Sequence, residues 1–141
     1  MLPILNDVNL EVLQGEAVAL VGPSGSGKSS LLMLIGGLER PSSGQIFVRG
    51  KEISKLSQAS MTSFRRDLIG IIFQSFHLIP TMTALENVMI PLEIIKTNDI
   101  FEKSYQALEK VGLSKRKSHY PAELSGGEQQ RVALARALVT K

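Results

Sequence analysis

The sequence predicts an α/β fold with an added helical part, and three observations support this class. An apolar, β-prone run at 17–21 leads through a glycine-rich loop into a second apolar segment at 30–35. Short apolar runs at 45–49 and 69–73 alternate with segments of helical pattern. After residue 76, helical patterns follow one another with no strand between them. This order predicts an α/β core followed by a helical subdomain.

Composition places the chain among ordinary globular domains. Its 141 residues are 43% hydrophobic and 21% charged, which suits one domain with a real core. The net charge of +3 is too small to indicate a nucleic-acid or lipid partner, and the lack of cysteine excludes disulfides and thiolate metal sites. The N-terminus does not resemble a signal peptide, and the longest apolar stretch, 31–38, is far shorter than the roughly 20 residues that cross a bilayer. We therefore expect any membrane role to be peripheral.

The first half is expected to contain strands around one helix. Residues 4–13 and 17–21, joined by a turn at 14–16, read as a β-hairpin. A helix begins near Gly27 and ends at the glycine pair 36–37. The remaining elements expected in this half are a strand, a polar helix and a buried strand, at 45–49, 58–67 and 69–73.

The second half is expected to hold two helices before a final one. The first follows a capping box formed by Thr83 and Glu86 and is interrupted at Pro91. The second spans 99–111 and stops at Gly112. A basic run at 115–117 lies in the loop that follows.

The final helix has the clearest local signals. Ser125 caps it, and Glu128, three residues later, completes a capping box. Its apolar residues are expected to share one face of the helix. These residues are Val132, Ala135, Leu138 and Val139.

The glycine-rich loop has the residue types and spacing of a phosphate-binding loop. Residues 22–29 read G-P-S-G-S-G-K-S, which matches G-x-x-x-x-G-K-S between a strand and a helix. The glycines let backbone N–H groups point inward, and the helix N-terminus adds unpaired amides and a positive dipole end. A flexible Gly/Ser turn is the alternative, but the strand, loop and helix come in the required order. We therefore predict a nucleoside triphosphate site.

Two side chains of this loop have distinct predicted roles. The Lys28 ammonium is assigned to the β- and γ-phosphates, and the Ser29 hydroxyl to Mg²⁺. The residues expected to contact the nucleotide are Gly22, Pro23, Ser24, Gly25, Ser26, Gly27, Lys28, Ser29 and Ser30.

A second phosphate-binding element is indicated at the start of the final helix. Ser125, Gly126 and Gly127 place a hydroxyl and two unobstructed backbone amides at a helix N-terminus. The alternative is that Ser125 and Glu128 only cap the helix, and spacing alone favours that alternative.

Three motifs in this order resemble the ATP-binding subunit of ABC transporters over nearly the whole chain. They are the Walker A loop 22–29, Gln74 after the 69–73 run, and the stretch Leu124-Ser125-Gly126-Gly127-Glu128-Gln129-Gln130-Arg131, which is similar to the family signature. Residues 73–80 and 83–88 look most like the lipoprotein-release and macrolide-export branch, whose subunits drive FtsX/MacB-like membrane permeases. The resemblance implies an ABC-type P-loop core with an N-terminal antiparallel part and an inserted helical subdomain. The implied parts of this single partial domain are the core, the helical subdomain and the signature helix, at 1–75, 76–125 and 125–141.

The resemblance also implies roles for residues. Gln74 would contact Mg²⁺ and the attacking water, and with Lys28 it forms the catalytic set expected here; spacing alone would leave Gln74 an ordinary surface glutamine. Ser125, Gly126 and Gly127 would bind the γ-phosphate of ATP held by a partner subunit, so that a working site needs a dimer. The in-trans ATP contacts implied by the signature are Leu124, Ser125, Gly126, Gly127, Glu128 and Gln129.

The family's catalytic pattern continues past residue 141. Its Walker B glutamate and switch histidine follow the signature helix and are not among these residues, and an adenine-stacking aromatic precedes them. We therefore expect this chain to bind Mg·ATP without efficient hydrolysis, and to unfold less cooperatively than a complete ATPase domain.

The expected function is to couple ATP binding and hydrolysis to export or lipoprotein release through a separate permease. The chain is expected to lie at the cytoplasmic face of the inner (plasma) membrane. The segment 83–92 is expected to meet that permease, or simply to pack in the core. One alternative is a soluble ABC-type ATPase acting on DNA or ribosomes; another is a non-catalytic truncated nucleotide-binding protein. No specific nucleic-acid partner is expected, because the basic runs 65–66 and 115–117 lack interleaved aromatics and read as solvated surface.

Overall fold

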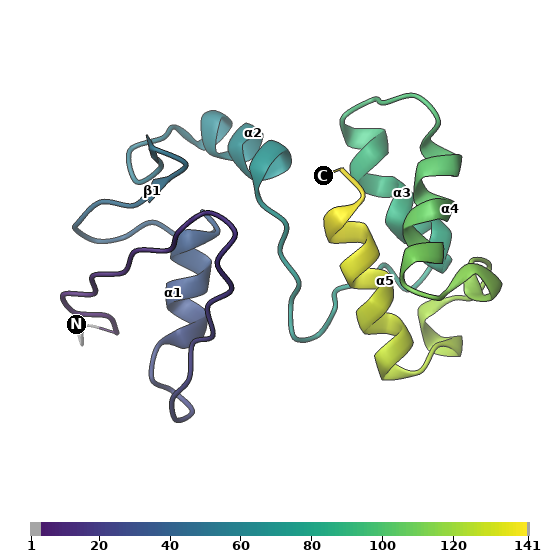
Figure 1. Cartoon of the computed structure of the whole chain (residues 1–141), viewed down its shortest axis with the longest axis horizontal. Helices are drawn as coiled ribbons and strands as arrows, with labels where there is room; N and C mark the ends of the chain where they lie inside the picture. The colour runs from purple at the N-terminus through teal and green to yellow at the C-terminus, as the bar shows by residue number, and fades with distance from the viewer. Residues whose placement is uncertain (1–3, 141) are drawn as a thin grey trace. The chain divides into compact units, whose positions relative to one another are not determined.

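The computed structural model describes residues 4–140, which form two compact units. The first unit runs up to Arg65 and the second begins at Arg66. Figure 1 shows their elements in chain order. The first unit contains α1 (Lys28–Ile35), β1 (Phe47–Val48), β2 (Lys51–Glu52) and most of α2 (Gln58–Leu68). The second contains α3 (Ala84–Ile94), α4 (Ile100–Lys110), the short 3₁₀ turns η1 (Ser114–Arg116) and η2 (Pro121–Glu123), and α5 (Gly126–Leu138).

Helix α1 begins and ends at glycines, as the sequence predicts. Gly27 is its N-cap in the left-handed region, and Gly36 is its C-cap. The next glycine, Gly37, has φ +66, and a Cβ there would overlap the sulfur of Met61 in α2. Arg65 also donates a hydrogen bond from Nη1 to the Gly37 carbonyl oxygen at 2.6 Å. The glycine pair therefore allows α2 to pack closely where α1 ends.

Strands β1 and β2 form a short antiparallel pair. Phe47 lies opposite Glu52, and the turn between the strands places Arg49 and Gly50 at φ +51 and +74. Two successive positive φ angles are typical of the tight hairpin turn that matches strand twist. The strand expected at 45–49 is thus confirmed in shortened form, with a partner strand that the pattern did not predict.

The other expected strands are not formed. Residues 4–13, 17–21 and 69–73 have no strand pairing, and β1 and β2 make the only sheet within residues 4–140. The turn at 14–16 is present, since the Glu16 N–H donates to the Leu13 carbonyl oxygen at 3.1 Å. A strand is stable only when a neighbouring strand satisfies its backbone groups. Apolar periodicity indicates burial but does not supply that partner.

Helix α3 passes through its proline. The capping box predicted for Thr83 and Glu86 is present, but the helix continues beyond Pro91 to Ile94. The predicted interruption was therefore wrong. Pro91 lies in the last part of the helix, where it removes only one backbone donor. The final turn still closes, because the Ile95 N–H donates to the Pro91 carbonyl oxygen at 3.3 Å.

Helix α4 matches its predicted range closely. Asp99 is its N-cap at φ +59, and Gly112 follows its end at φ +73. Part of the basic run expected in a loop forms the 3₁₀ turn η1 instead.

The core of the second unit lies between α3, α4 and α5 (Figure 1). Val132 and Ala135 of α5 are buried, and Val139 packs against them. Leu138 is 54% exposed, so its predicted place on the same face was wrong. At about 100° per residue, Leu138 lies about 120° around the helix from Val132. The other buried core residues are Ala84, Val88, Leu108, Leu113 and Leu124.

Asn87 is a fully buried polar residue within this core. Its Oδ1 accepts from the Ile79 N–H at 2.8 Å, and its Nδ2 donates to the carbonyl oxygens of Ile79, Met82 and Thr83 at 3.0 to 3.1 Å. One side chain therefore holds the segment that leads into α3.

Candidate nucleotide-binding site

The loop 22–29 uses its glycines for backbone conformation. Gly22, Gly25 and Gly27 have φ of +153°, +79° and +87°. A Cβ at Gly27 would also lie 2.9 Å from the Leu5 Cδ2 and 3.3 Å from the Ile4 carbonyl oxygen. The predicted glycine requirement is therefore visible in this structure.

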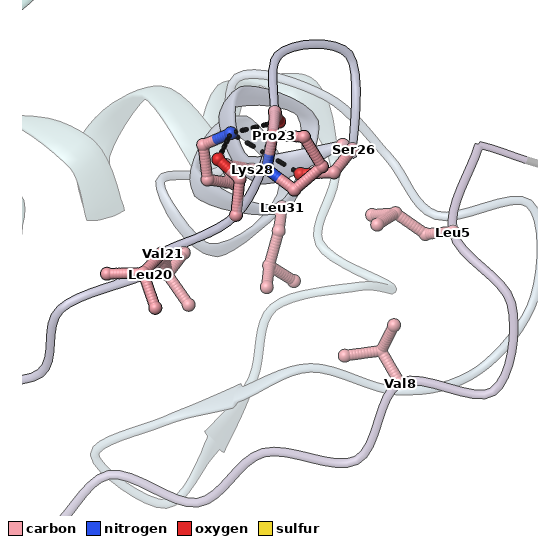
Figure 2. A pocket seen from close by; sticks show the side chains of 10 residues that line it. Leu5, Val8, Leu20, Val21, Pro23, Ser26, Lys28 and Leu31 are labelled. Carbon is pink, nitrogen blue, oxygen red and sulfur yellow. Dashed lines mark hydrogen bonds between the residues drawn. The ribbon is translucent and has the colours of Figure 1, made fainter.

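Lys28 folds back over the loop. Its ammonium donates to the carbonyl oxygens of Gly22 and Pro23 at 2.9 and 2.6 Å, and lies 3.3 Å from the Ser26 Oγ (Figure 2). The charge is thus held at the mouth of the loop by acceptors of the loop itself. A phosphate group entering the loop would offer stronger, charged acceptors to the same ammonium.

The N-terminus of α1 faces this loop without a competing cap. Gly27 has no side-chain cap, and the first turn contains no acidic residue. The first N–H groups of a helix have no intrahelical acceptor, so those of Lys28, Ser29 and Ser30 remain available to an anion. The Ser29 side chain is on the same turn and exposed. Positive φ glycines, free amides and an ammonium fit a phosphate group, and a hydroxyl oxygen fits a hard cation such as Mg²⁺.

An open pocket of about 340 Å³ adjoins the loop. Ser26 and Lys28 contribute its polar side chains, Pro23 lies beside them, and apolar side chains form the rest (Figure 2). The apolar residues are Leu5, Val8, Leu20, Val21 and Leu31. The segment before the loop therefore contributes to the pocket although it is not a strand.

Gln74 lies in the second unit, in an exposed turn. The Phe76 N–H donates to the Phe73 carbonyl oxygen at 3.0 Å, which places Gln74 at the first corner of the turn. Phe76 and His77 follow with φ of +58° and +48°, and the His77 ring contacts the Phe73 ring at 4.7 Å. Gln74 and the loop 22–29 therefore belong to different units.

The same unit brings the Gln74 turn to the signature helix. Arg136 of α5 donates from Nη1 to the His77 carbonyl oxygen and from Nη2 to the Phe76 carbonyl oxygen, both at 2.7 Å. Desolvation by burial lowers the pKa of Arg136 from its ordinary value. Because Arg136 is about 60 residues from these carbonyls, no local sequence pattern signals the contact.

Ser125 caps α5 as predicted. Its Oγ accepts from the Glu128 N–H at 3.3 Å, and its own N–H and hydroxyl donate to the Glu128 Oε2 at 2.8 Å each. The backbone N–H of Ser125 is the main cause that lowers the pKa of Glu128. A Cβ at Gly126 would meet nothing within 4 Å, so that part of the helix start faces open space.

The six signature residues do not all face outward. Leu124 is 6% exposed and belongs to the core. The Gln129 amide donates to the carbonyl oxygens of Pro121 and Leu124 at 3.0 and 3.1 Å, which ties η2 to α5. Ser125, Gly126 and Gly127 are exposed.

The basic run 115–117 is exposed, as predicted, and two of its side chains also contact other residues. Arg116 Nε donates to the Glu128 Oε1 at 3.0 Å. The Lys117 ammonium lies 5.9 and 5.1 Å from the centres of the Phe101 and Tyr105 rings. The only sequence signal for the ion pair is the opposite charge of Arg116 and Glu128, and a spacing of 12 residues matches no local pairing pattern.

No helix within residues 4–140 is both long enough and apolar enough to cross a bilayer.

Comparison with known proteins places the chain in a family. The family model described as "ABC transporter" matches residues 5–141. The chain therefore belongs to the ABC transporter family, as part of its ATP-binding domain. It is similar to the lipoprotein-releasing system ATP-binding proteins LolD of Geobacter metallireducens and Coxiella burnetii. The identities are 51% and 50%, over 96% and 99% of this chain and 61% of each relative.

Solved structures agree with this assignment. The fold is similar to that titled "Dimeric structure of a post-hydrolysis state of the ATP-binding cassette MJ0796 bound to ADP and Pi". The TM-score is 0.90 at 42% identity, over 97% of this chain and 62% of that one. The resemblance and the ABC-type fold class predicted from the sequence are thus confirmed. The chain spans about three fifths of the length of these relatives.

Proposed function

We propose that this chain is the ATP-binding part of an ABC transporter subunit. The whole subunit would couple ATP binding and hydrolysis to lipoprotein release or export through a separate, FtsX/MacB-like permease, and these 141 residues would supply the ATP binding. Similarity to the lipoprotein-releasing system ATP-binding proteins LolD supports the lipoprotein-release assignment. In this proposal the chain lies at the cytoplasmic face of the inner membrane, held there by the permease.

The observation that carries the proposal is the position of Lys28. It is the first residue of α1, and its ammonium lies over the glycine-rich loop that precedes this helix. Its ammonium, 2.6 to 2.9 Å from two loop carbonyls, would turn to the β- and γ-phosphates. The Ser29 hydroxyl would hold Mg²⁺, which neutralises phosphate charge when bound. Gln74 would orient water at the same centre.

The proposal includes a dimer. One copy holds the triphosphate at 22–29, and the other offers Ser125, Gly126 and Gly127 at the N-terminus of α5. The MJ0796 cassette, which is dimeric and bound to ADP and Pi, supports the proposal of a dimer. Two half-sites on one chain would then complete each other between two copies.

Mg·ATP binding tests the proposal directly. Isothermal titration of Mg·ATP into the chain is expected to show binding that Lys28→Ala weakens at least tenfold, because a charge-assisted contact to two phosphates is lost. Lys51→Ala is the matched control, since Lys51 is an exposed lysine in β2 of the same unit. Equal binding by the Lys28→Ala variant and the unaltered chain would overturn the proposal.

The same samples test whether these 141 residues turn ATP over. Binding without efficient hydrolysis stays a prediction from the sequence. Phosphate release that Lys28→Ala abolishes would contradict it while leaving the binding assignment intact.

A further inference from the structure

A negative charge stands beside the proposed phosphate-binding hydroxyl. The Glu128 Oε2 is 2.8 Å from the Ser125 Oγ. A phosphate oxygen about 2.7 Å from that hydroxyl oxygen, toward which the single hydroxyl hydrogen would turn from Oε2, would lie within about 5.5 Å of the carboxylate. Like charges at that distance repel, so the carboxylate opposes the ligand that Ser125 is proposed to bind.

Arg116 occupies the other oxygen of the same carboxylate. Its Nε donates to the Glu128 Oε1 at 3.0 Å, whereas Ser125 uses only Oε2. The Glu128 side chain is 18% exposed, against 48% for Arg116, so water screens the carboxylate only in part.

The guanidinium is itself held in place. Arg116 Nη1 lies 3.1 Å from the His119 Nε2. The His119 carbonyl oxygen accepts from the Ala84 N–H at 2.8 Å, which joins this residue to the start of α3. Arg116 therefore reaches Glu128 from a segment anchored to the core.

We propose that Arg116 is a positioning residue of the second half-site: it holds the Glu128 carboxylate as the cap of Ser125 and offsets its charge, which lets a partner copy's triphosphate approach. This inference rests on the proposed function. Without Arg116 the cap would remain, but its full negative charge would face the phosphate. The loss is expected in ATP-dependent association of two copies rather than in folding.

Sedimentation equilibrium of the full chain with Mg·ATP at low salt tests this. Arg116→Ala is expected to weaken the ATP-dependent dimer about tenfold, the size of one moderately screened charge interaction. Arg116→Lys keeps the charge and is expected to lose less. Raising the salt should shrink the difference between Arg116→Ala and the unaltered chain.

The Glu128→Gln background separates a charge effect from a structural one. Glutamine can still accept from Ser125 but carries no charge, so Arg116→Ala should change dimer affinity less than twofold there. Lys115→Ala is the matched control, because Lys115 is an exposed neighbour with no ion pair within residues 4–140. It should also stay within twofold.

The outcomes separate a failure of the proposed Arg116 role from a failure of the proposed function. An equal tenfold loss from Arg116→Ala in both backgrounds overturns the charge role, as does an unchanged dimer in the single variant. Absence of any ATP-dependent dimer in the unaltered chain overturns the proposed function, and the inference with it.

Discussion

The Arg136 Nη1 donates to the His77 carbonyl oxygen at 2.7 Å, across 59 positions of the sequence. Its Nη2 donates to the Phe76 carbonyl oxygen, also at 2.7 Å. Both acceptors belong to residues in the left-handed region, a conformation that costs about 1 kcal/mol or more for a non-glycine residue. Arg136 therefore stabilises a strained turn directly after Gln74 and ties it to the signature helix. Two of the stretches on which the family resemblance rests are thus joined in one unit.

Arg136→Ala is predicted to lower the free energy of unfolding by about 1–2 kcal/mol. Two charge-assisted hydrogen bonds are lost, and the carbonyl oxygens of a strained turn lose their donor. Urea unfolding monitored by circular dichroism measures the change. Arg131→Ala, an exposed arginine on the same helix, should change it by less than about 0.5 kcal/mol. Equal effects of the two variants would show that the two hydrogen bonds of Arg136 do not stabilise the fold.

Gly27→Ala is predicted to reduce Mg·ATP affinity more than Gly25→Ala. Both positions have positive φ, but only at Gly27 would a Cβ meet other atoms, at 2.9 Å. Gly44→Ala is the control, since Gly44 has φ +88 in open space outside the loop. It should carry a similar backbone strain and leave ATP affinity unchanged. If all three variants bind alike, the loop geometry does not determine binding.

Stability is predicted to fall in acid because of the two capping boxes. The backbone N–H of Thr83 lowers the pKa of Glu86, and that of Ser125 lowers the pKa of Glu128. A depressed folded-state pKa means that the contribution is complete above the unfolded value of about 4.3 and is lost as pH falls through the folded-state value. Urea midpoints measured from pH 6 to pH 2.5 should show the loss.

The Glu86→Gln, Glu128→Gln double variant tests the cause of that acid loss. Glutamine keeps a capping oxygen but does not titrate, so the double variant should have a flatter pH profile. An identical slope in both proteins would assign the acid loss to other carboxylates.

The helices of the second unit were predictable because their signals are local. Capping residues such as Thr83 and Ser125 lie within one turn of the amides that they cap, and both capping boxes are present. Gly27 and Gly112 mark helix boundaries for the same reason, through their positive φ. Residues within four positions of each other carry this information in the sequence itself.

Strands and long-range contacts were not predictable in the same way. The run 69–73 has a strand-like pattern but lies unpaired, close to α5, where a Cβ at Gly70 would be 2.8 Å from the Ala137 carbonyl oxygen. Arg116 and Arg136 find their partners 12 and about 60 residues away. The sequence shows that an arginine is charged, but it does not show which carbonyl or carboxylate group will accept from it in the fold.

Asn87 provides the strongest stability prediction, because a fully buried amide satisfies four backbone groups. Asn87→Ala is predicted to lower the free energy of unfolding by about 2–4 kcal/mol, since the Ile79 N–H loses its acceptor in a buried place. Asn87→Asp should be worse at neutral pH, because a carboxylate would face the three carbonyl oxygens that now accept from Nδ2. Urea unfolding at pH 7 measures both variants. If the aspartate variant is the more stable of the two, Asn87 does not act as the donor to these carbonyls.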